Sequence, residues 1–563
     1  MMQRYFVPVL AGIVGLALAS SSLAQREAGR GRAAGAVSPA DWPAYNRTVA
    51  GERYSPLGQI TRGNVAALQR ICTYELPEVN AFQTGPIVVD GTMYFTTALG
   101  SYAIDAATCR LKWMQRLAIA NPPGLGANRG FAYYGGMLFR GTPDGHVIAL
   151  AASDGHQIWD QRIDVEAPGV SIPMAPIAAD GRVYVGNAGG DNVGVTGHVY
   201  AFDAQDGHLL WKFDTVSSAV RSTWTNPHLP ITGGAFWTSF TLDRAKGILY
   251  VPAGNPAPDF DSLDRTGDDL YSDSVIALDA ASGRMLGYRQ LVRHDDHDWD
   301  VDSAPALVTT RAGREIIASA NKDGLLSILD RSAVGQSGAA HARRSSPRSS
   351  PRSSPRSSPR NAPPIIPLLS QTPTTTRSNV HVPLSSERTV HFCPGIGGGT
   401  EWNGAAYSPQ TDSIFVGAVD QCERVRLQRP LHIPPAGQIW FASALPMAQM
   451  SDPASSARGW LTAFNAENGA VRWKFHAPHP ILAGVTPTAG GLVFAADMGG
   501  SVYALDQRSG RVLWHADNAQ AIGGGIVSYE AAGHQRVAVA VGMHSPVWPG
   551  AASSSRIVVY GLP

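Results

Sequence analysis

The sequence predicts an all-β fold, an eight-bladed β-propeller, and three observations support this. A short pattern recurs: an apolar residue, one further residue, Asp, a turn with Gly, and a closing Trp. Trp113, Trp159 and Trp211 are 46 and 52 residues apart, and Trp473 and Trp514 are 41 apart. Spacings of this size are typical of four-stranded propeller blades. The 60 Gly and 40 Pro residues suit many short strands joined by turns.

The recurring pattern assigns a structural role to each of its residues. Clear copies begin at Ala103, Ala149, Ala201, Ala463 and Ala504, and weaker copies begin at Ala277 and Ile328. We expect the Asp to fix the turn, the Gly to adopt a positive φ, and the Trp to pack between neighbouring blades. These tryptophans are therefore interpreted as structural rather than functional.

Turn signals between apolar runs define the number of blades. Asp-Gly joins two apolar runs within residues 87–95 and again within 177–185, which predicts β-hairpins. Eight units follow: six between about residues 85 and 473, a seventh ending at Trp514, and an eighth. The eighth combines residues 524–560 with an N-terminal strand near 67–74. This joining of the chain ends closes the ring and removes free sheet edges.

The N-terminus has the features of an export signal. Residues 1–24 combine Arg4, an apolar stretch at 7–19 and the small-residue cleavage site Ser22-Leu23-Ala24. The apolar stretch is too short to span a membrane. We expect a flexible tail at 25–40, one propeller domain at 41–563, and a periplasmic or secreted protein.

One stretch departs from the repeat. A fourfold Ser-Ser-Pro-Arg run occupies residues 345–360, and the surrounding Ser/Pro/Arg-rich sequence extends over about 337–386. It has little apolar surface to bury, so we expect a disordered surface insertion there. A basic docking loop is the weaker alternative.

Charge and cysteine content limit the partners. The net charge of +1 gives no indication of a nucleic-acid or membrane-surface partner. Four cysteines fit an oxidising compartment, and the sequence has neither CxxC nor CxxCH. A covalently attached c-type haem in this chain is therefore excluded.

Residues that the repeat does not explain are the functional candidates: Asp191, Trp237, Asn255, the acidic segment 298–302 and Lys322. Each also has a structural interpretation, as a turn residue, a blade Trp or a solvated surface charge. The combination of Asp, Asn and Asp nevertheless provides the oxygen ligands that a hard cation such as Ca²⁺ prefers.

Several segments together resemble the pyrroloquinoline quinone (PQQ)-dependent alcohol dehydrogenases over nearly the whole mature chain. The matching segments are 41–45, 53–57, 185–197, 232–237, 252–255, 299–300, 321–324 and 329–331. Their number, order and spacing make the signal stronger than any single motif.

The resemblance implies a role for each candidate. Trp237 forms the floor under PQQ. Asp191, Asn255 and Asp300 bind Ca²⁺ or a similar ion, which polarises the quinone carbonyl. Asp300 also takes the proton of the substrate hydroxyl as hydride passes to the quinone. Lys322 stabilises the charge that develops on the reduced quinone oxygen.

Further cofactor contacts follow from the same resemblance. Gly189 and Gly190 lie in the metal and quinone loop, and Arg129 matches an arginine near the quinone carboxylates. Gln83 stands where the family usually has Glu. Glu401 replaces an amide and places an acid near the substrate side.

Other positions distinguish this chain within the family. Asp302 resembles the extra acid of the lanthanide-using branch, but it is equally explained as a solvated loop acid. Pro123-Gly124 replaces the adjacent cysteines above the quinone. Cys393 and Cys422 match a family disulfide, and the N-terminal pair Cys72 and Cys109 is expected to form a second one.

The implied function is a periplasmic PQQ- and metal-dependent dehydrogenase that oxidises an alcohol, polyol or sugar-like hydroxyl. Electrons are expected to pass to a separate periplasmic cytochrome c or other acceptor, because the chain lacks a haem motif. The alternative is a non-enzymatic β-propeller binding scaffold of the outer-membrane assembly type. A scaffold has no need for the five candidate residues together.

Overall fold

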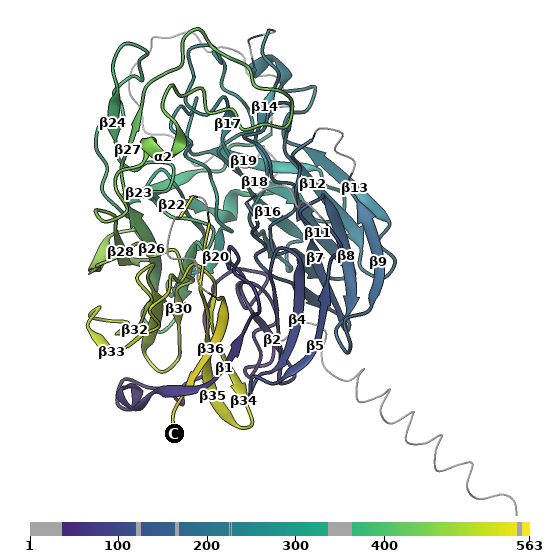
Figure 1. Ribbon diagram of the computed structural model, residues 1–563, viewed down its shortest axis with the longest axis vertical. Coiled ribbons are helices and arrows are strands. Elements are labelled where there is room, and N and C mark those ends of the chain that lie inside the picture. Colours follow the sequence, from purple (N-terminus) through teal and green to yellow (C-terminus); the bar gives the residue numbers. More distant parts are fainter. Residues whose placement is uncertain are drawn as a thin grey trace, which may run out of the picture. The chain divides into compact units, whose positions relative to one another are not determined.

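The computed structural model describes residues 37–119, 125–163, 168–224, 226, 228–335, 363–545, 547–548 and 554–563. Within these residues the fold is an eight-bladed β-propeller of eight four-stranded antiparallel sheets (Figure 1). It lies in the unit Pro39–Pro563. The predicted fold class and blade number are confirmed. None of the helices among the described residues has the length and apolar character needed to cross a membrane.

The eight blades are numbered in chain order. Blades 1 to 3 contain β2 (Ile87–Val89), β3 (Thr92–Thr96), β4 (Gly100–Asp105) and β5 (Leu111–Arg116); β6 (Ala132–Tyr134), β7 (Met137–Gly141), β8 (His146–Ala151) and β9 (Gln157–Arg162); and β10 (Ile177–Ala179), β11 (Arg182–Gly186), β12 (His198–Asp203) and β13 (Leu209–Asp214). Blades 4 and 5 contain β15 (Thr241–Asp243), β16 (Ile248–Ala253), β18 (Ser274–Asp279) and β19 (Met285–Gln290); and β20 (Ala306–Thr309), β21 (Glu315–Ala320), β22 (Leu325–Asp330) and β23 (Leu368–Pro373).

Blades 6 to 8 contain β25 (Ala405–Ser408), β26 (Ser413–Asp420), β28 (Arg458–Asn465) and β29 (Val471–Ala477); β30 (Thr486–Pro487), β31 (Leu492–Ala496), β32 (Ser501–Asp506) and β33 (Val512–Asp517); and β34 (Ile526–Ala531), β35 (His534–Val541), β36 (Arg556–Gly561) and β1 (Gln69–Glu75). Two further strand pairs join β14 (Thr232–Gly233) to β17 (Pro256–Ala257) and β24 (Val390–Phe392) to β27 (Glu423–Val425). The described helices are the short η1 (Val65–Ala67), η2 (Arg221–Thr223), η3 (Arg331–Ala333) and α2 (Met447–Met450).

The closing tryptophan of a blade docks on the next blade, as predicted. Trp159 of blade 2 donates a hydrogen bond from Nε1 to the carbonyl of Ala204 in blade 3, at 3.1 Å. Gly207 has φ +77°, and a Cβ there would lie 2.7 Å from the Trp159 ring. Glycine is required at this position because the indole covers the turn. Trp113, Trp211, Trp473 and Trp514 donate equivalent hydrogen bonds.

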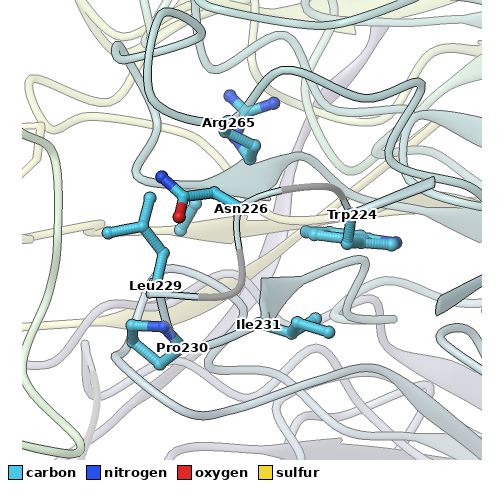
Figure 2. Close-up of a pocket in the computed structure, with 7 residues that line it drawn as sticks. Trp224, Asn226, Leu229, Pro230, Ile231 and Arg265 are labelled. Atoms are coloured by element: carbon cyan, nitrogen blue, oxygen red, sulfur yellow. The ribbon is translucent and has the colours of Figure 1, made fainter. Parts of the chain in front are cut away.

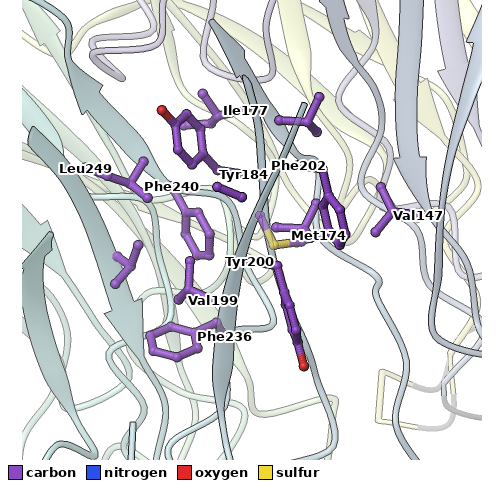
Figure 3. Close-up of a cluster of buried hydrophobic side chains, with 14 of the residues drawn as sticks. Val147, Met174, Ile177, Tyr184, Val199, Tyr200, Phe202, Phe236, Phe240 and Leu249 are labelled. Carbon is purple, nitrogen blue, oxygen red and sulfur yellow. The ribbon is translucent and has the colours of Figure 1, made fainter. Parts of the chain in front are cut away.

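The hydrophobic core lies between neighbouring blades. The middle strand β12 is buried at four consecutive residues, whereas the outer strand β13 is mostly exposed or half-buried. A strand that contacts a blade on each side must be apolar on both faces. Figure 3 shows the resulting packing at blades 2 to 4, where Met174, Phe202 and Phe240 belong to one buried cluster.

The chain ends meet in blade 8. The outer strand β1 pairs with β36, and Cys72 of β1 forms a disulfide with Cys109 beside blade 1. The predicted eighth blade and this disulfide are both confirmed. The ring is thus closed by strand pairing and by a covalent bond.

The predicted insertion needs a correction. Part of the stretch at about 337–386 is ordered: β23 (Leu368–Pro373) pairs with β22 as the outer strand of blade 5. Its residues alternate between half-buried and exposed, so the strand needs few apolar residues, and its composition resembled a disordered segment. The Ser-Ser-Pro-Arg run, the predicted signal at 1–24, most of the tail and Pro123-Gly124 lie outside the described residues.

Candidate functional site

The candidate residues all lie in connections at one end of the propeller. Asp191 and Lys322 follow the second strands of blades 3 and 5, and Asn255 follows the second strand of blade 4. Trp237 and Asp300 precede the first strands of blades 4 and 5. Because strands alternate in direction within each blade, these two kinds of connection share one end of the sheets. The Asp-Gly turns lie at the opposite end.

Asp300 is the centre of the site. Its Oδ1 accepts hydrogen bonds from Trp237 Nε1 at 3.2 Å and from the Asn255 backbone N–H at 3.0 Å. Its Oδ2 forms an ion pair with Lys322 Nζ at 2.6 Å. Gly254 makes this approach possible, since a Cβ there would lie 2.3 Å from Asp300 Oδ1. The structure thus brings four predicted residues into direct contact.

The indole of Trp237 is half-buried and flanked by two cations. Lys322 Nζ lies 5.6 Å from the ring centroid, and Arg129 Cζ lies 4.8 Å from it. Arg129 also lies 5.0 Å from the Trp402 ring and donates a hydrogen bond to the Trp237 carbonyl at 3.0 Å. Burial lowers the pKa of Arg129 to about 10, against the opposing charges of Tyr45, Glu401 and Asp302. This geometry combines an aromatic face with positive charge.

Three carboxylates gather beside Asp300. Oxygen atoms of Asp191, Asp259 and Asp298 lie within 4.8 Å of one another. Burial, and then the negative charge of Asp300, raise the pKa of Asp191 to about 6, and Lys322 opposes this rise. Burial and neighbouring carboxylates raise the pKa values of Asp259 and Asp298 far above the usual range. Carboxylates at this separation repel one another unless they bind protons or a cation.

Asp259 was not among the residues predicted from the sequence. It lies four residues after Asn255, in the loop that follows β17. Its side chain is fully buried. Neither carboxylate oxygen has a hydrogen-bond partner among the described residues. The sequence carried one signal: an acid that closely follows the predicted amide ligand.

Backbone contacts hold the cluster together. Trp440 donates its N–H to the Asp191 carbonyl at 2.8 Å, and its own carbonyl accepts the Asp259 N–H at 3.2 Å. The Trp440 side chain is buried and donates to the His432 carbonyl at 3.1 Å. One residue from a distant loop therefore positions two of the three acids.

Asp302, the other acid predicted to bind the metal, has Glu401 as its main charged neighbour. Asp302 is 1% exposed, and neither of its carboxylate oxygens has a hydrogen-bond partner among the described residues. After burial, the charge of Glu401 contributes most to the raised pKa of Asp302. Burial raises the pKa of Glu401 to about 7, with Lys322 opposing. Asp302 is not a member of the group of Asp191, Asp259 and Asp298.

The other predicted cofactor contacts, Gln83, Gly189 and Gly190, lie in tightly packed surroundings. Gln83 is 5% exposed, and its Oε1 has no partner among the described residues. Gly189 has φ +103°, and a Cβ there would lie 2.6 Å from the Gly169 carbonyl oxygen. A Cβ on Gly190 would lie 2.9 Å from Ala235 Cβ. Close packing of the loop therefore already explains both glycines.

Comparison with known proteins places the chain in a family. Residues 42–350, more than half of the chain, match the family described as "Glucose/ethanol/alcohol dehydrogenase, beta-propeller domain". The chain belongs to this family. A shorter segment, residues 457–543, matches the family "Outer membrane protein assembly factor BamB".

Individual relatives agree with this family. The quinohemoprotein alcohol dehydrogenase ADH IIB of Pseudomonas putida is 26% identical over 560 residues, covering 93% of this chain and 77% of that protein. The lanthanide-dependent methanol dehydrogenase of Methylacidiphilum fumariolicum is 26% identical over 526 residues, covering 87% and 82%. The crystal structure of the quinohemoprotein alcohol dehydrogenase from Comamonas testosteroni has a TM-score of 0.79 and 25% identity, covering 98% and 84%.

The residues of this dehydrogenase-family propeller fit the groups that the family uses, a PQQ and a cation. The buried carboxylate of Asp259, which has no hydrogen-bond partner in the part of the chain that the structure describes, is a suitable ligand for a hard cation. The half-buried Trp237 ring, with Arg129 and Lys322 both close to it, suits a flat, anionic ring.

A small pocket elsewhere has a different lining. Trp224, Asn226, Leu229 and Arg265 surround it, together with Pro230, Ile231 and Ala257 (Figure 2). None of the predicted site residues lines it. We assign it no part in the chemistry.

A second disulfide joins Cys393 and Cys422, next to a proline that contacts the segment carrying Asp298 and Asp300. It confirms the pairing expected from the resemblance. The neighbouring Pro394 carbonyl accepts a hydrogen bond from Trp299 Nε1 at 3.0 Å. Trp299 lies between Asp298 and Asp300 in the sequence and also stacks on His297, with ring centroids 4.2 Å apart. The disulfide loop thus anchors Trp299, the residue between the two acids.

Proposed function

We propose that this chain is a periplasmic PQQ- and metal-dependent dehydrogenase that oxidises the hydroxyl group of a small alcohol, polyol or sugar-like substrate. The observation that carries the proposal is the set of contacts around Asp300. Trp237, Asn255 and Lys322 all contact this one buried carboxylate, next to a group of further acids. Family membership supports the same reaction class.

Trp237, Arg129 and Lys322 are proposed to bind the quinone. The indole supplies an apolar face, and the two cations supply charge for anionic oxygens. Bound PQQ supplies the two-electron acceptor that amino-acid side chains lack. Gln83, Gly189, Gly190 and Glu401 remain proposed cofactor contacts.

Asp300 is proposed as the general base. A carboxylate oxygen has about two lone-pair sites. Oδ1 already accepts two hydrogen bonds, whereas Oδ2 accepts from Lys322 alone. Oδ2 is therefore the atom with capacity for the substrate hydroxyl proton, and Asp300 also binds the cation only if one of the two hydrogen bonds to Oδ1 is given up. Lys322 fixes the orientation of this oxygen and supplies positive charge where negative charge develops.

Asp191, Asn255 and Asp300 are proposed to bind Ca²⁺ or a lanthanide ion. The Asn255 side chain is near enough to Asp191 to oppose the rise in its pKa, and Asp191 and Asp300 both supply carboxylate oxygens. Asp302 is the fourth ligand that the resemblance suggests, and its position beside Glu401 makes it a point to test. The electrons are proposed to leave through a separate cytochrome c or other acceptor.

The alternative is a binding scaffold of the outer-membrane assembly type. The match of residues 457–543 to that family favours it only over part of the chain. A scaffold gains nothing from burying unpaired carboxylates, which are costly without a ligand.

Reconstitution tests the proposal. Purified protein is loaded with PQQ and either Ca²⁺ or La³⁺, and dye reduction is measured over a panel of alcohols, polyols and sugars. We expect a quinone absorption spectrum and turnover with one substrate class. The Asp300→Asn variant is expected to retain the spectrum and lose turnover by at least about 100-fold, the usual contribution of a general base. Absence of both spectrum and turnover in the wild type would favour the scaffold.

A further inference from the structure

We propose that Asp259 and Asp298 are direct ligands of the metal ion. Together with Asp191 they form a group of three carboxylates that makes the site selective for a trivalent lanthanide over Ca²⁺. Neither acid was assigned a ligand role by the sequence. The inference rests on the metal-binding part of the proposed function, and it adds both ligands and a preference for one class of ion.

Burial and lack of partners single out Asp259. Its side chain is fully buried, and both carboxylate oxygens lack hydrogen-bond partners among the described residues. One of these oxygens lies within 4.8 Å of ligand atoms of Asp191 and Asp298. Buried charges are normally paired or bind metal ions, and a cation between the three acids supplies the missing partner.

The backbone fixes the relative positions of two of the acids. Trp440 bonds to the backbone of Asp191 through its N–H and to the backbone of Asp259 through its carbonyl. Both acids are thus held by one buried residue before any ion binds. A preorganised pair of carboxylates of this kind is typical of a binding site rather than of a solvated loop.

Charge favours a trivalent ion. Asp191, Asp259, Asp298 and Asp300 contribute four negative charges when ionised, and Lys322 contributes one positive charge at 2.6 Å from Asp300 and 3.6 Å from Asp298. These five groups carry a net of three negative charges, and Asp302 and Glu401 add to the negative side while Arg129 opposes them. A trivalent ion therefore compensates more of this buried negative charge than Ca²⁺ does. Asp302 interacts with Glu401 and Asp300 but is not a member of the close group of three acids, so Asp259 is the better candidate for the additional acid.

Terbium luminescence tests this inference directly. Tb³⁺ is titrated into the protein with and without PQQ, its emission is excited through tryptophan, and Ca²⁺ is used as competitor. We expect Asp259→Asn and Asp298→Asn each to weaken Tb³⁺ binding at least tenfold and to weaken Ca²⁺ binding less. Emission lifetimes in H₂O and D₂O are expected to show about one additional coordinated water in each variant, where the lost oxygen stood.

Two further variants serve as comparisons. Asp264→Asn removes the same charge from the same loop at a partly exposed residue that pairs with Arg429, and it is expected to leave Tb³⁺ affinity and hydration unchanged. Asp302→Asn is expected to leave the number of coordinated waters unchanged. If Asp302→Asn gains a water and Asp259→Asn does not, the inference is wrong. Because Asp298→Asn tests the same group independently, a poorly folded Asp259 variant does not remove the test.

The outcome separates this inference from the proposed function. Wild-type protein that shows a PQQ spectrum and turnover, with Asp259→Asn and Asp298→Asn binding Tb³⁺ normally, overturns the inference and supports the function. Wild-type Tb³⁺ binding that depends on Asp259, without PQQ binding or turnover, supports the ligand assignment and overturns the function. Failure of the wild type to bind Tb³⁺ with or without PQQ overturns the inference, and it leaves the function standing only if the Ca²⁺-loaded protein shows a PQQ spectrum and turnover.

Discussion

Replacement of Glu401 by Gln is expected to change how the stability of the protein depends on pH. Glu401 is 6% exposed, and burial raises its pKa from 4.5 to about 7, with Asp300 adding to the rise and Lys322 and Arg129 opposing it. The amide keeps the size of the side chain and cannot ionise. The change therefore isolates the effect of one buried acid.

The sign follows from the proton count. Between about pH 4.5 and 7 the folded protein keeps the Glu401 proton, whereas the unfolded chain loses it. The folded state binds more protons, so the free energy of unfolding falls as the pH rises through this window and is constant above it. Each pKa unit corresponds to about 1.4 kcal/mol, which gives a total of about 3 kcal/mol.

Glu401→Gln removes this fall in the free energy of unfolding, because the amide does not ionise. The variant is expected to match the wild type near pH 4.5 and to be more stable by about 3 kcal/mol at pH 8. With an unfolding entropy of about 2.1 cal/mol/K per residue, the propeller should melt about 3 °C higher at pH 8. Calorimetric melting of the protein without PQQ or metal, at pH 4.5, 6 and 8, measures this difference.

A surface acid provides the control. Glu387 is exposed, so Glu387→Gln should leave the melting temperature unchanged across the same pH range. A Glu401→Gln variant whose difference from the wild type is the same at pH 4.5 and pH 8 would refute the reasoning. So would a variant that is less stable than the wild type at pH 8.

Other predictions concern the blades and the ion pair. Gly207→Ala should lower the melting temperature more than Gly181→Ala, because both have a positive φ but only the Cβ at 207 meets an indole. Equal losses in the two variants would contradict the docking role. Replacing Cys72 and Cys109 by Ser should lower the free energy of unfolding by about 4 kcal/mol, measured in urea, since the bond closes a loop of 37 residues. Lys322→Gln should destabilise the PQQ-free protein by about 3 kcal/mol, because it leaves a buried carboxylate unpaired, and unchanged melting would exclude that pairing.

The repeat in the sequence was sufficient to predict the propeller. Each blade depends on local features: the Asp-Gly turns, the alternation of apolar residues and the Trp that docks on a Gly of the next blade. Because these features act over one or two neighbouring blades, they can be read directly from residue order. Even the pairing of β1 with β36 followed from counting the units.

Outer strands were harder to predict than inner ones. β23 was mistaken for part of a disordered insertion because only half of its residues contact the blade. A half-exposed strand carries few apolar residues, so its composition is close to that of a loop. Pairing with β22 supplies the order that composition does not reveal.

The candidate site also has some features that the sequence predicts and others that depend on the tertiary structure. The sequence by itself determined the types of residue and their place in the connections, which is why Trp237, Asn255, Asp300 and Lys322 were found and do meet. Only the tertiary structure decided that Asp259 lies with Asp191 and Asp298, and that Glu401 is the main charged neighbour of Asp302. The physical reason is that loops distant in sequence, held by backbone bonds such as those of Trp440, decide which carboxylates share a space.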